Sequence, residues 1–371
     1  MLNINMKTKV YSDKHVIPYL RDIKNKKILI VCDSFMSHET RLKYLKDELS
    51  SHNKISIFNK AVPDPTLDVC ILGIKEMLQV KPDIIIGYGG GSSIDTAKAI
   101  LYFASMGNVY KKPIFIAVPT TSGTGSEVTS VSVIKDADTN RKHLLVSEDI
   151  LPDVALLEPG LTLTIPKNIT ANTGLDVLTH SLEAYVSKNA NAFSDALAEK
   201  SVELVFKSLI NCYSHGGNYK ARQSMQEAST LAGMAFNSAG LGLNHSIAHQ
   251  IGGMFHIPHG LANAIILEKI IDFNSNDEAT RSKYAKMAYK TQIVNVNASS
   301  KVALKMLKRL IGILIMSLEI NMNLSEYDIC KADYYSKISE MVKNTKEDFC
   351  FNTNPVTPTD ADIEKIFKSI Y

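Results

Sequence analysis

The chain has 371 residues, 45% of them hydrophobic and 21% charged, and its formal net charge is +3. This length favours two domains over a single hydrophobic core, and the composition is typical of a soluble globular protein. The small net charge and the short basic clusters exclude a broad nucleic-acid-binding surface, so we expect no nucleic acid partner.

The sequence contains no stretch as long as a transmembrane helix, and Met1 to Val10 lacks the apolar core of a signal peptide. Residues Met1 to Lys9 carry no convincing amphipathic targeting helix. Far-separated cysteines without a Cys-x-x-Cys pair argue against a thiolate metal site or a disulfide framework: Cys32, Cys70, Cys212, Cys330 and Cys350. We therefore expect a protein of the reducing cytoplasm with no membrane partner.

Strands and helices alternate through the first part of the chain. Near-continuous apolar runs, typical of strands covered by helices on both faces, occur at residues 27–32, 54–58, 83–88 and 113–118. This alternation predicts an α/β N-terminal domain with a mostly parallel, Rossmann-like sheet over residues 1–160.

After about Pro166 the pattern becomes helical and strand-like alternation nearly vanishes. Apolar residues at helical spacing predict six helices, at Asp176–Val186, Ser194–Leu209, Arg222–Ala235, Ser246–Met254, Arg281–Thr291 and Val302–Leu318. The sequence therefore predicts an all-α C-terminal domain over residues 161–371.

Two glycine- and hydroxyl-rich loops each follow a predicted strand. Gly89-Gly90-Gly91-Ser92 precedes a clear helix start, and Pro119 to Ser126 comes after the next strand. Glycines allow close approach to a ligand, and a helix N-terminus offers free N–H groups to an anion. One such loop is as readily a tight turn, but two at the carboxyl edge of a parallel sheet predict a nucleotide site.

Asp33 ends the first predicted strand. A carboxylate at this place binds the ribose hydroxyls of NAD and repels the additional phosphate of NADP. A helix N-cap or turn residue is an equally good interpretation from the bare sequence.

Histidines and one aspartate gather in two segments of the second half. Asp176 and His180 are four residues apart, as are His245 and His249, so each pair projects from one helix face. His256 and Pro258-His259-Gly260 follow. Three imidazoles and a carboxylate suit Fe(II) or Zn(II). The spacing leaves open which three histidines bind, and the alternative is a helical core with several buried histidines.

These segments together resemble the iron-containing (group III) alcohol dehydrogenases. The resemblance covers nearly the whole chain and rests on GGGSSIDTAKAI at 89–100, PTTSGTGSEVT at 119–129, ANTGLDVLTHSLEAYV at 171–186 and NHSIAHQIGGMFHIPHGLANAI at 244–265. Residues 354–356 read Asn-Pro-Val where the family usually has Asn-Pro-Arg, so no role of that arginine is carried over.

The resemblance implies the dehydroquinate synthase-like fold of this family, with the active site between two domains. It implies Asp176, His180, His245 and His259 as metal ligands, with His249 as an unliganded catalytic histidine and His256 outside the ligand set. It implies NAD rather than NADP, bound by Asp33, Gly89, Gly90, Gly91, Ser92, Asp95, Thr120, Thr121, Thr124 and Lys142.

Within the family, the stretches DALAEKSVELVF and ASTLAGMAFNSAGLGLNH are most similar to the 1-propanol dehydrogenases of propanediol-utilisation microcompartments. This similarity implies an NAD(H)-linked enzyme that interconverts short-chain aldehydes and primary alcohols. The substrate pair that it implies is propionaldehyde and 1-propanol. It also implies a homo-oligomer, encapsulation in a microcompartment, and other microcompartment enzymes as partners.

Two other classes of function are weighed against this one. A non-redox lyase resembling dehydroquinate synthase needs a basic pocket for a polyanionic substrate, and the histidine segments lack additional Arg and Lys. An inactive scaffold predicts a degraded ligand set, whereas all four implied ligands are present. Both alternatives are therefore less favoured than the dehydrogenase.

Overall fold

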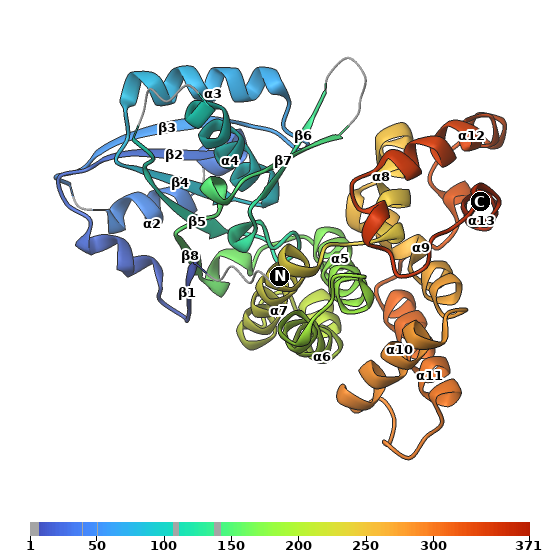
Figure 1. Cartoon of the computed structure of the whole chain (residues 1–371). Helices are drawn as coiled ribbons and strands as arrows, with labels where there is room; N and C mark the ends of the chain where they lie inside the picture. Colours follow the sequence, from blue (N-terminus) through green and yellow to red (C-terminus); the bar gives the residue numbers. More distant parts are fainter. Residues whose placement is uncertain (1–6, 39, 50, 107–110, 137–141) are drawn as a thin grey trace. The chain divides into compact units, whose positions relative to one another are not determined.

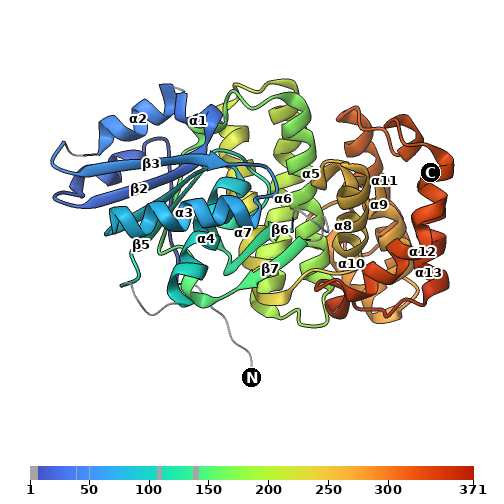
Figure 2. The same cartoon turned by 90° about the horizontal axis from the view of Figure 1, so that it is seen from above.

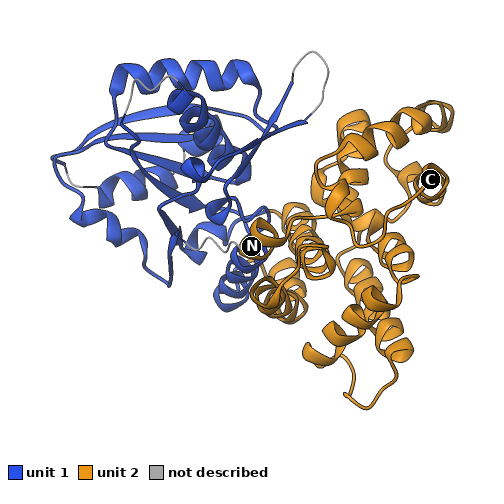
Figure 3. Ribbon diagram, viewed as in Figure 1, with its two compact units in different colours: residues 1–165, 217–233 blue, residues 166–216, 234–371 orange. Residues whose placement is uncertain are grey.

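The computed structural model describes residues 7–38, 40–49, 51–106, 111–136 and 142–371. The interpretation of Met1 to Lys9 therefore lies largely outside the described residues. The chain forms two compact units, one of residues 1–165 and 217–233 and the other of residues 166–216 and 234–371 (Figure 3).

The first unit is built on a six-stranded sheet in the order β1-β8-β5-β4-β2-β3 (Figure 1). Every pairing in this sheet is parallel. A separate antiparallel pair is formed by β6 and β7. The strands are β1 (Lys9–Ser12), β2 (Lys27–Asp33), β3 (Lys54–Ala61), β4 (Ile84–Gly89), β5 (Ile114–Pro119), β6 (Val131–Lys135), β7 (Lys142–Val146) and β8 (Val154–Leu157).

Helices cover both faces of this sheet, as its unbroken apolar strands require. Ile28 and Ile30 of β2 pack with the core under the 3-10 helix η1 (Ile17–Asp22), α1 (Ser34–His38) and α2 (Thr40–Glu48). Leu29 and Val31 of the same strand face the core under α3 (Leu67–Val80) and α4 (Gly91–Met106) (Figure 2). Alternate residues of one strand therefore fill two different cores.

The sequence predicts a single boundary between two domains at residue 160. In the structure the first unit also includes residues 217–233, which form most of helix α7 (Tyr219–Ala239). Most of this helix belongs to the first unit, where Gln226 donates a hydrogen bond to the Pro119 carbonyl at 3.2 Å. Thr230 donates another to the buried Glu127 carboxylate at 2.6 Å. These contacts join residues about a hundred positions apart, so local sequence patterns do not reveal them.

Apart from α7, the second unit contains eight α-helices within residues 166–371: α5 (Lys167–Val186), α6 (Ala192–Ser214), α8 (Leu243–Phe255), α9 (His259–Asn274), α10 (Glu278–Lys290), α11 (Ser300–Ser317), α12 (Lys331–Glu347) and α13 (Asp360–Lys368). One core joins α8 and α9 to α12 and α13. Side-chain caps fix the starts of α6 and α13, where Asn191 and Thr359 form capping boxes.

The predicted α/β half followed by a helical half is confirmed. Four short strands (β1, β6, β7 and β8) were not predicted individually, nor were helices α1, α2 and α3 of the first unit and α9, α12 and α13 of the second. Helix α9 is apolar around most of its circumference, because most of it is buried, and so it lacks the one-sided pattern of a surface helix. Within the part of the chain that the structure describes, no helix combines the length and apolarity needed to cross a bilayer.

Candidate metal and nucleotide sites

Four of the predicted metal-binding side chains converge within the second unit. Asp176 and His180 lie one turn apart on α5, His245 lies on α8, and His259 is the first residue of α9. One potential ligand atom from each lies within 4.8 Å of the other three. Of the five histidines that spacing left open, the structure therefore gathers three around Asp176.

The Asp176 carboxylate lies at the centre of this group. Its Oδ1 is 3.6 Å from His259 Nε2 and 3.8 Å from His245 Nε2. Its Oδ2 is 4.0 Å from His180 Nε2. Three of the four side chains are buried, and His259 keeps 32% of its side chain exposed. The group therefore has one side that a small molecule can reach.

Gly260 explains how His259 comes so close to α5. A Cβ atom at this position would lie only 2.1 Å from the Asn172 carbonyl oxygen, so only glycine allows the two backbones to approach. This contact brings the first residue of α9 beside Asp176, which is the physical reason for the Pro-His-Gly sequence.

Glu183 fixes the orientation of the His245 ring by contacting Nδ1, the ring nitrogen that faces away from the cluster. Its Oε2 lies 2.5 Å from His245 Nδ1, and its Oε1 accepts a hydrogen bond from the Asn244 backbone at 2.7 Å. Burial lowers the pKa of His245 to about 4 and raises the pKa of Glu183 to about 7. His245 is therefore a neutral imidazole at neutral pH, with Nε2 facing the cluster, which is the form that binds metals.

Asn263 supplies a test of whether these side chains fit a cation. Its amide nitrogen lies 2.7 Å from Asp176 Oδ1, 3.1 Å from His245 Nε2 and 3.3 Å from His259 Nε2. Its own Oδ1 accepts from Asn244 at 2.9 Å. Three potential ligand atoms thus converge on one neutral amide nitrogen, which has only two N–H groups to donate. Three converging acceptors are also the arrangement that a divalent metal would satisfy.

Neither Glu183 nor Asn263 was predicted from the sequence as part of the site. Glu183 follows Asp176 by seven residues and Asn263 follows His259 by four, so both lie on the same helix face as a ligand. That periodicity was the available signal, but it does not distinguish a supporting carboxylate or amide from an ordinary core residue.

The two remaining histidines lie outside the group of four. His249 Nδ1 lies 2.8 Å from Asp348 Oδ2, and its ring stacks on His259 with centroids 5.4 Å apart. His256 is exposed and ends α8 in a left-handed conformation, at φ 57°. One aromatic ring lies against the group, since the centroid of Phe236 is 4.7 Å from that of His180. A second lies against His249, with the Phe349 centroid at 5.4 Å.

In the first unit, three predicted cofactor segments follow neighbouring strands of the sheet. Asp33 ends β2, Gly89 ends β4 and Pro119 ends β5. The chain order of the sheet reverses between β2 and β4, and ligands of open parallel sheets bind at the carboxyl edge beside such a reversal. The loop positions therefore agree with a nucleotide site.

The two glycine- and hydroxyl-rich loops lie against each other. Thr120 donates its backbone N–H to the Gly89 carbonyl at 2.9 Å. A Cβ atom on Gly91 would lie 2.5 Å from Thr124 Cγ2, so the first turn of α4 needs glycine there. Residues of this surface that keep some exposure are Gly90, Ser92, Thr121 and Thr124.

Other predicted cofactor residues make structural contacts. Asp33 Oδ1 caps α1 by accepting from the Met36 backbone at 2.7 Å, which is the capping alternative of the sequence analysis. Asp95 accepts from the Ser126 hydroxyl at 2.5 Å and from the Val133 backbone at 3.3 Å. Lys142 pairs with the Asp64 carboxylate at 2.7 Å. Asp95 therefore stabilises the loop at residues 119–126 through its hydrogen bond with Ser126.

Lys98, one turn further along α4, also stabilises the chain that follows this loop. It was not predicted from the sequence as part of the site. Its side chain is fully buried, and Nζ donates to the Thr129 hydroxyl and to the Val131 carbonyl, both at 2.8 Å. Burial lowers the pKa of Lys98 to about 8, although Asp95 and Glu127 act in the opposite direction. One turn of α4 thus contacts the chain at four positions between Ser126 and Val133.

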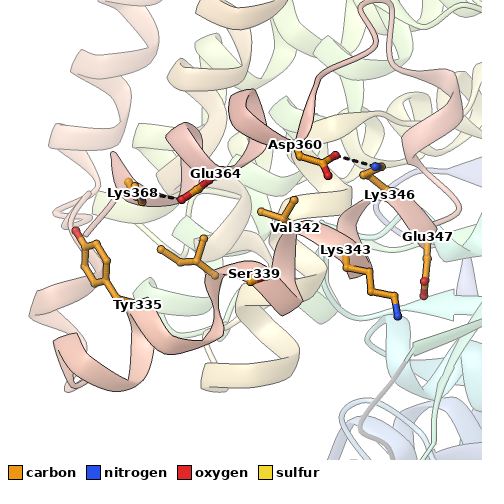
Figure 4. A pocket seen from close by; sticks show the side chains of 10 residues that line it. Tyr335, Ser339, Val342, Lys343, Lys346, Glu347, Asp360, Glu364 and Lys368 are labelled. Atoms are coloured by element: carbon orange, nitrogen blue, oxygen red, sulfur yellow. Dashed lines mark hydrogen bonds and ion pairs between the residues drawn. The ribbon is translucent and has the colours of Figure 1, made fainter.

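A groove of about 760 Å³ lies along α12 and α13 (Figure 4). Two of its lysines are paired with carboxylates, with Lys346 2.7 Å from Asp360 and Lys368 2.6 Å from Glu364. No predicted metal or cofactor residue is among its lining residues, which are Tyr335, Ile338, Ser339, Val342, Lys343, Lys346, Glu347, Asp360, Glu364 and Lys368. We assign it no part in the sites above.

Comparison with known families covers both units. Residues 8–159 match the iron-containing alcohol dehydrogenase model, and residues 170–371 match the C-terminal model of the Fe-containing alcohol dehydrogenase family. The chain belongs to the iron-containing alcohol dehydrogenase family and is an oxidoreductase that interconverts alcohols and aldehydes. The lyase alternative is accordingly not favoured.

The chain is also similar to individual proteins of known activity or structure. The chain is 41% identical to the 1-propanol dehydrogenase of Citrobacter freundii, over 100% of both chains. It is 35% identical to the NADPH-dependent butanol dehydrogenase of Clostridium saccharobutylicum, over 100% of this chain and 98% of the relative. Among solved structures, a 1,3-propanediol oxidoreductase is similar with a TM-score of 0.91 and 30% identity, over 100% of both chains.

The contact between Glu183 and His245 generates a first prediction. Glu183→Gln keeps the size of the side chain and an acceptor for Asn244, but it removes the charge that supports the His245 ring. We expect metal affinity to fall roughly 10- to 100-fold, measured by competition with a chelator. The control is Glu203→Gln on α6, an exposed carboxylate paired with Lys200. Unchanged affinity in Glu183→Gln contradicts the supporting role.

Proposed function

We propose that this chain is a metal-dependent, NAD(H)-linked alcohol dehydrogenase that interconverts propionaldehyde and 1-propanol. The observation that carries the proposal is the convergence of Asp176, His180, His245 and His259, with one potential ligand atom from each within 4.8 Å of the others. Membership of the iron-containing alcohol dehydrogenase family gives the reaction class.

Fe(II) is the proposed metal, with Zn(II) as the second candidate. One carboxylate and three imidazoles are donors that suit either ion, whereas a soft thiolate site would require cysteine. His245 is held neutral by burial, as a ligand must be. Iron is preferred because the family is iron-containing.

NAD(H) is the proposed cofactor, bound at the carboxyl edge of the sheet. The proposed contacts are Asp33, Gly89, Gly90, Gly91, Ser92, Asp95, Thr120, Thr121, Thr124 and Lys142. The N-terminus of α4 offers N–H groups to the diphosphate, beside the close contact of Gly91 and Thr124. Asp95 and Lys142 act mainly through the loops that they hold, because their charged groups contact Ser126 and Asp64.

When bound, the metal polarises the substrate oxygen as a Lewis acid and the nicotinamide carries the hydride. The chain's own side chains supply position and protons. Asp176 and the three histidines fix the place of the substrate oxygen. His249 exchanges the proton of that oxygen, directly or through a water that it orients. Phe236 and Phe349 offer apolar surface beside the ligands and limit access of water.

A small apolar substrate is favoured by these rings and by the similarity to the 1-propanol dehydrogenase of Citrobacter freundii. We further propose a homo-oligomer of two or more copies that works in the cytoplasm, inside a microcompartment with partner enzymes. This part of the proposal rests on the family resemblance of the sequence alone.

The reaction is tested by NADH oxidation with propionaldehyde, using protein stripped by chelator and reloaded anaerobically with Fe(II) or Zn(II). We expect activity to disappear on stripping and to return with iron. In His249→Gln, we expect turnover to fall by roughly 10²- to 10⁴-fold while the metal stays bound. Protein that binds metal but oxidises no NADH with any short aldehyde contradicts the proposed function.

The packing of Gly91 against Thr124 predicts a defect in cofactor binding alone. In Gly91→Val, the new side chain forces the two loops apart, and we expect NADH to bind at least about tenfold more weakly, or by about 1.4 kcal/mol. Fluorescence titration with NADH measures this. Gly217→Val is the matched control, since a Cβ at Gly217 has nothing within 4 Å. Equal affinity in both variants would place the nucleotide elsewhere.

Asp33 gives a separate prediction about cofactor choice. Asp33→Asn keeps an oxygen for the Met36 backbone but removes the charge that repels the additional phosphate of NADP. We expect the ratio of kcat/KM with NADPH to that with NADH to rise about tenfold. The control is Asp68→Asn, an exposed residue in the first turn of α3. An unchanged ratio assigns Asp33 to capping only.

A further inference from the structure

A carboxylate outside the proposed ligand set holds the proposed catalytic histidine. Asp348 follows α12, and its Oδ2 lies 2.8 Å from Nδ1 of His249 on α8. Both side chains are 9% exposed. Oδ1 accepts hydrogen bonds from the Ser246 hydroxyl at 3.2 Å and from the Cys350 backbone at 2.9 Å. Both carboxylate oxygens are therefore engaged, and the side chain has one well-defined position.

Asp348 is an acceptor in this contact. Burial alone would raise the pKa of Asp348, but His249 and the hydrogen bonds to the carboxylate outweigh it and leave the pKa below its usual value. An ionised carboxylate only accepts, so the hydrogen atom between the two groups belongs to His249 Nδ1. In a neutral imidazole the lone pair is then on Nε2, on the far side of the ring from Asp348.

The ring of His249 lies beside two of the proposed metal ligands, His259 and His245. It stacks on His259 with an interplanar angle of 15°, and its centroid is 6.1 Å from that of His245. Phe349, whose side chain is 39% exposed, lies on the ring as well. A substrate oxygen held by the ligand group is therefore within the neighbourhood of His249.

We propose that Asp348 is a positioning residue that fixes His249 as the Nδ1–H tautomer, so that Nε2 exchanges the substrate proton. The step rests on the proposed function. In alcohol oxidation the O–H bond breaks, Nε2 takes the proton, and the hydride leaves the carbon for NAD⁺. In aldehyde reduction the doubly protonated ring returns that proton to oxygen as NADH is oxidised. Asp348 stays ionised throughout and orients the ring.

His249, Asp348 and Cys350 also bring three potential metal-ligand atoms within 4.8 Å of one another. Burial and the charge of Asp348 raise the pKa of the Cys350 thiol well above its usual value, so the thiolate that a metal requires is disfavoured. The carboxylate oxygens already have three hydrogen-bond donors. We therefore assign His249 and Asp348 to proton transfer, give the Cys350 thiol no part in metal binding, and expect a single metal per chain.

The tautomer is measured directly by ¹⁵N NMR of zinc-loaded protein labelled at histidine, with the His249 signals assigned by their loss in His249→Gln. We expect a protonated Nδ1 and an unprotonated Nε2 in the wild-type chain. In Asp348→Asn the amide can donate to Nδ1, which moves the ring hydrogen to Nε2. The matched control is Asp333→Asn on α12, an exposed residue paired with Lys337 at 3.7 Å.

Kinetics of the same variants distinguish positioning from folding. In Asp348→Asn we expect kcat to fall by roughly 10²- to 10⁴-fold, as when a triad aspartate is replaced, with the aldehyde KM and one metal per chain unchanged. Asp348→Glu keeps a carboxylate and should recover part of kcat. Asp333→Asn should match the wild-type chain in every measurement.

Several results would overturn the proposal. These are a hydrogen atom on Nε2 in the wild-type chain, a second metal ion that Asp348→Asn removes, or equal kcat in wild type and Asp348→Asn. The wild-type spectrum decides even if the variant does not fold. Failure of the loaded wild-type enzyme to reduce any aldehyde would instead reject the proposed function, and the NMR result would still report the tautomer.

Discussion

A carboxylate buried among three imidazoles is the constraint on which the second unit depends. The Asp176 side chain is 5% exposed, and His245 is kept neutral beside it by burial. A buried charge is costly unless it is paired or bound to a metal, and the neutral His245 ring provides a lone pair, not countercharge. A divalent cation would supply that charge, and we therefore propose that α5, α8 and α9 pack as a rigid cage for such an ion.

Much of this cage could be predicted from the sequence. The four-residue spacing of Asp176 and His180 places both on one face of a helix, and His259 stands out between proline and glycine. The supporting groups could not be predicted, because their roles come from tertiary contacts. Asn263 gains its role by meeting Asp176 across 87 positions of sequence, and Asp348 meets His249 across 99.

In the first unit, too, features set by local sequence patterns could be predicted, whereas features set by tertiary contacts could not. Strands β2 to β5 were predicted because buried parallel strands are nearly continuous apolar runs. The buried Lys98 looked like any helical lysine, since only the folded chain places Nζ against Thr129 and Val131. Asp33 illustrates a third case: the sequence left two roles open, and the structure shows one of them, the helix cap, without removing the charge that the other role needs.

The most direct test of the metal centre is X-ray absorption spectroscopy of protein reconstituted with one zinc ion per chain. The account predicts a first shell of three imidazole nitrogens and one carboxylate oxygen at roughly 2.0–2.2 Å, unchanged in His249→Gln. A sulfur neighbour, or fewer than three imidazoles, would contradict the assignment of Asp176, His180, His245 and His259. So would a spectrum that changes when His249 is replaced.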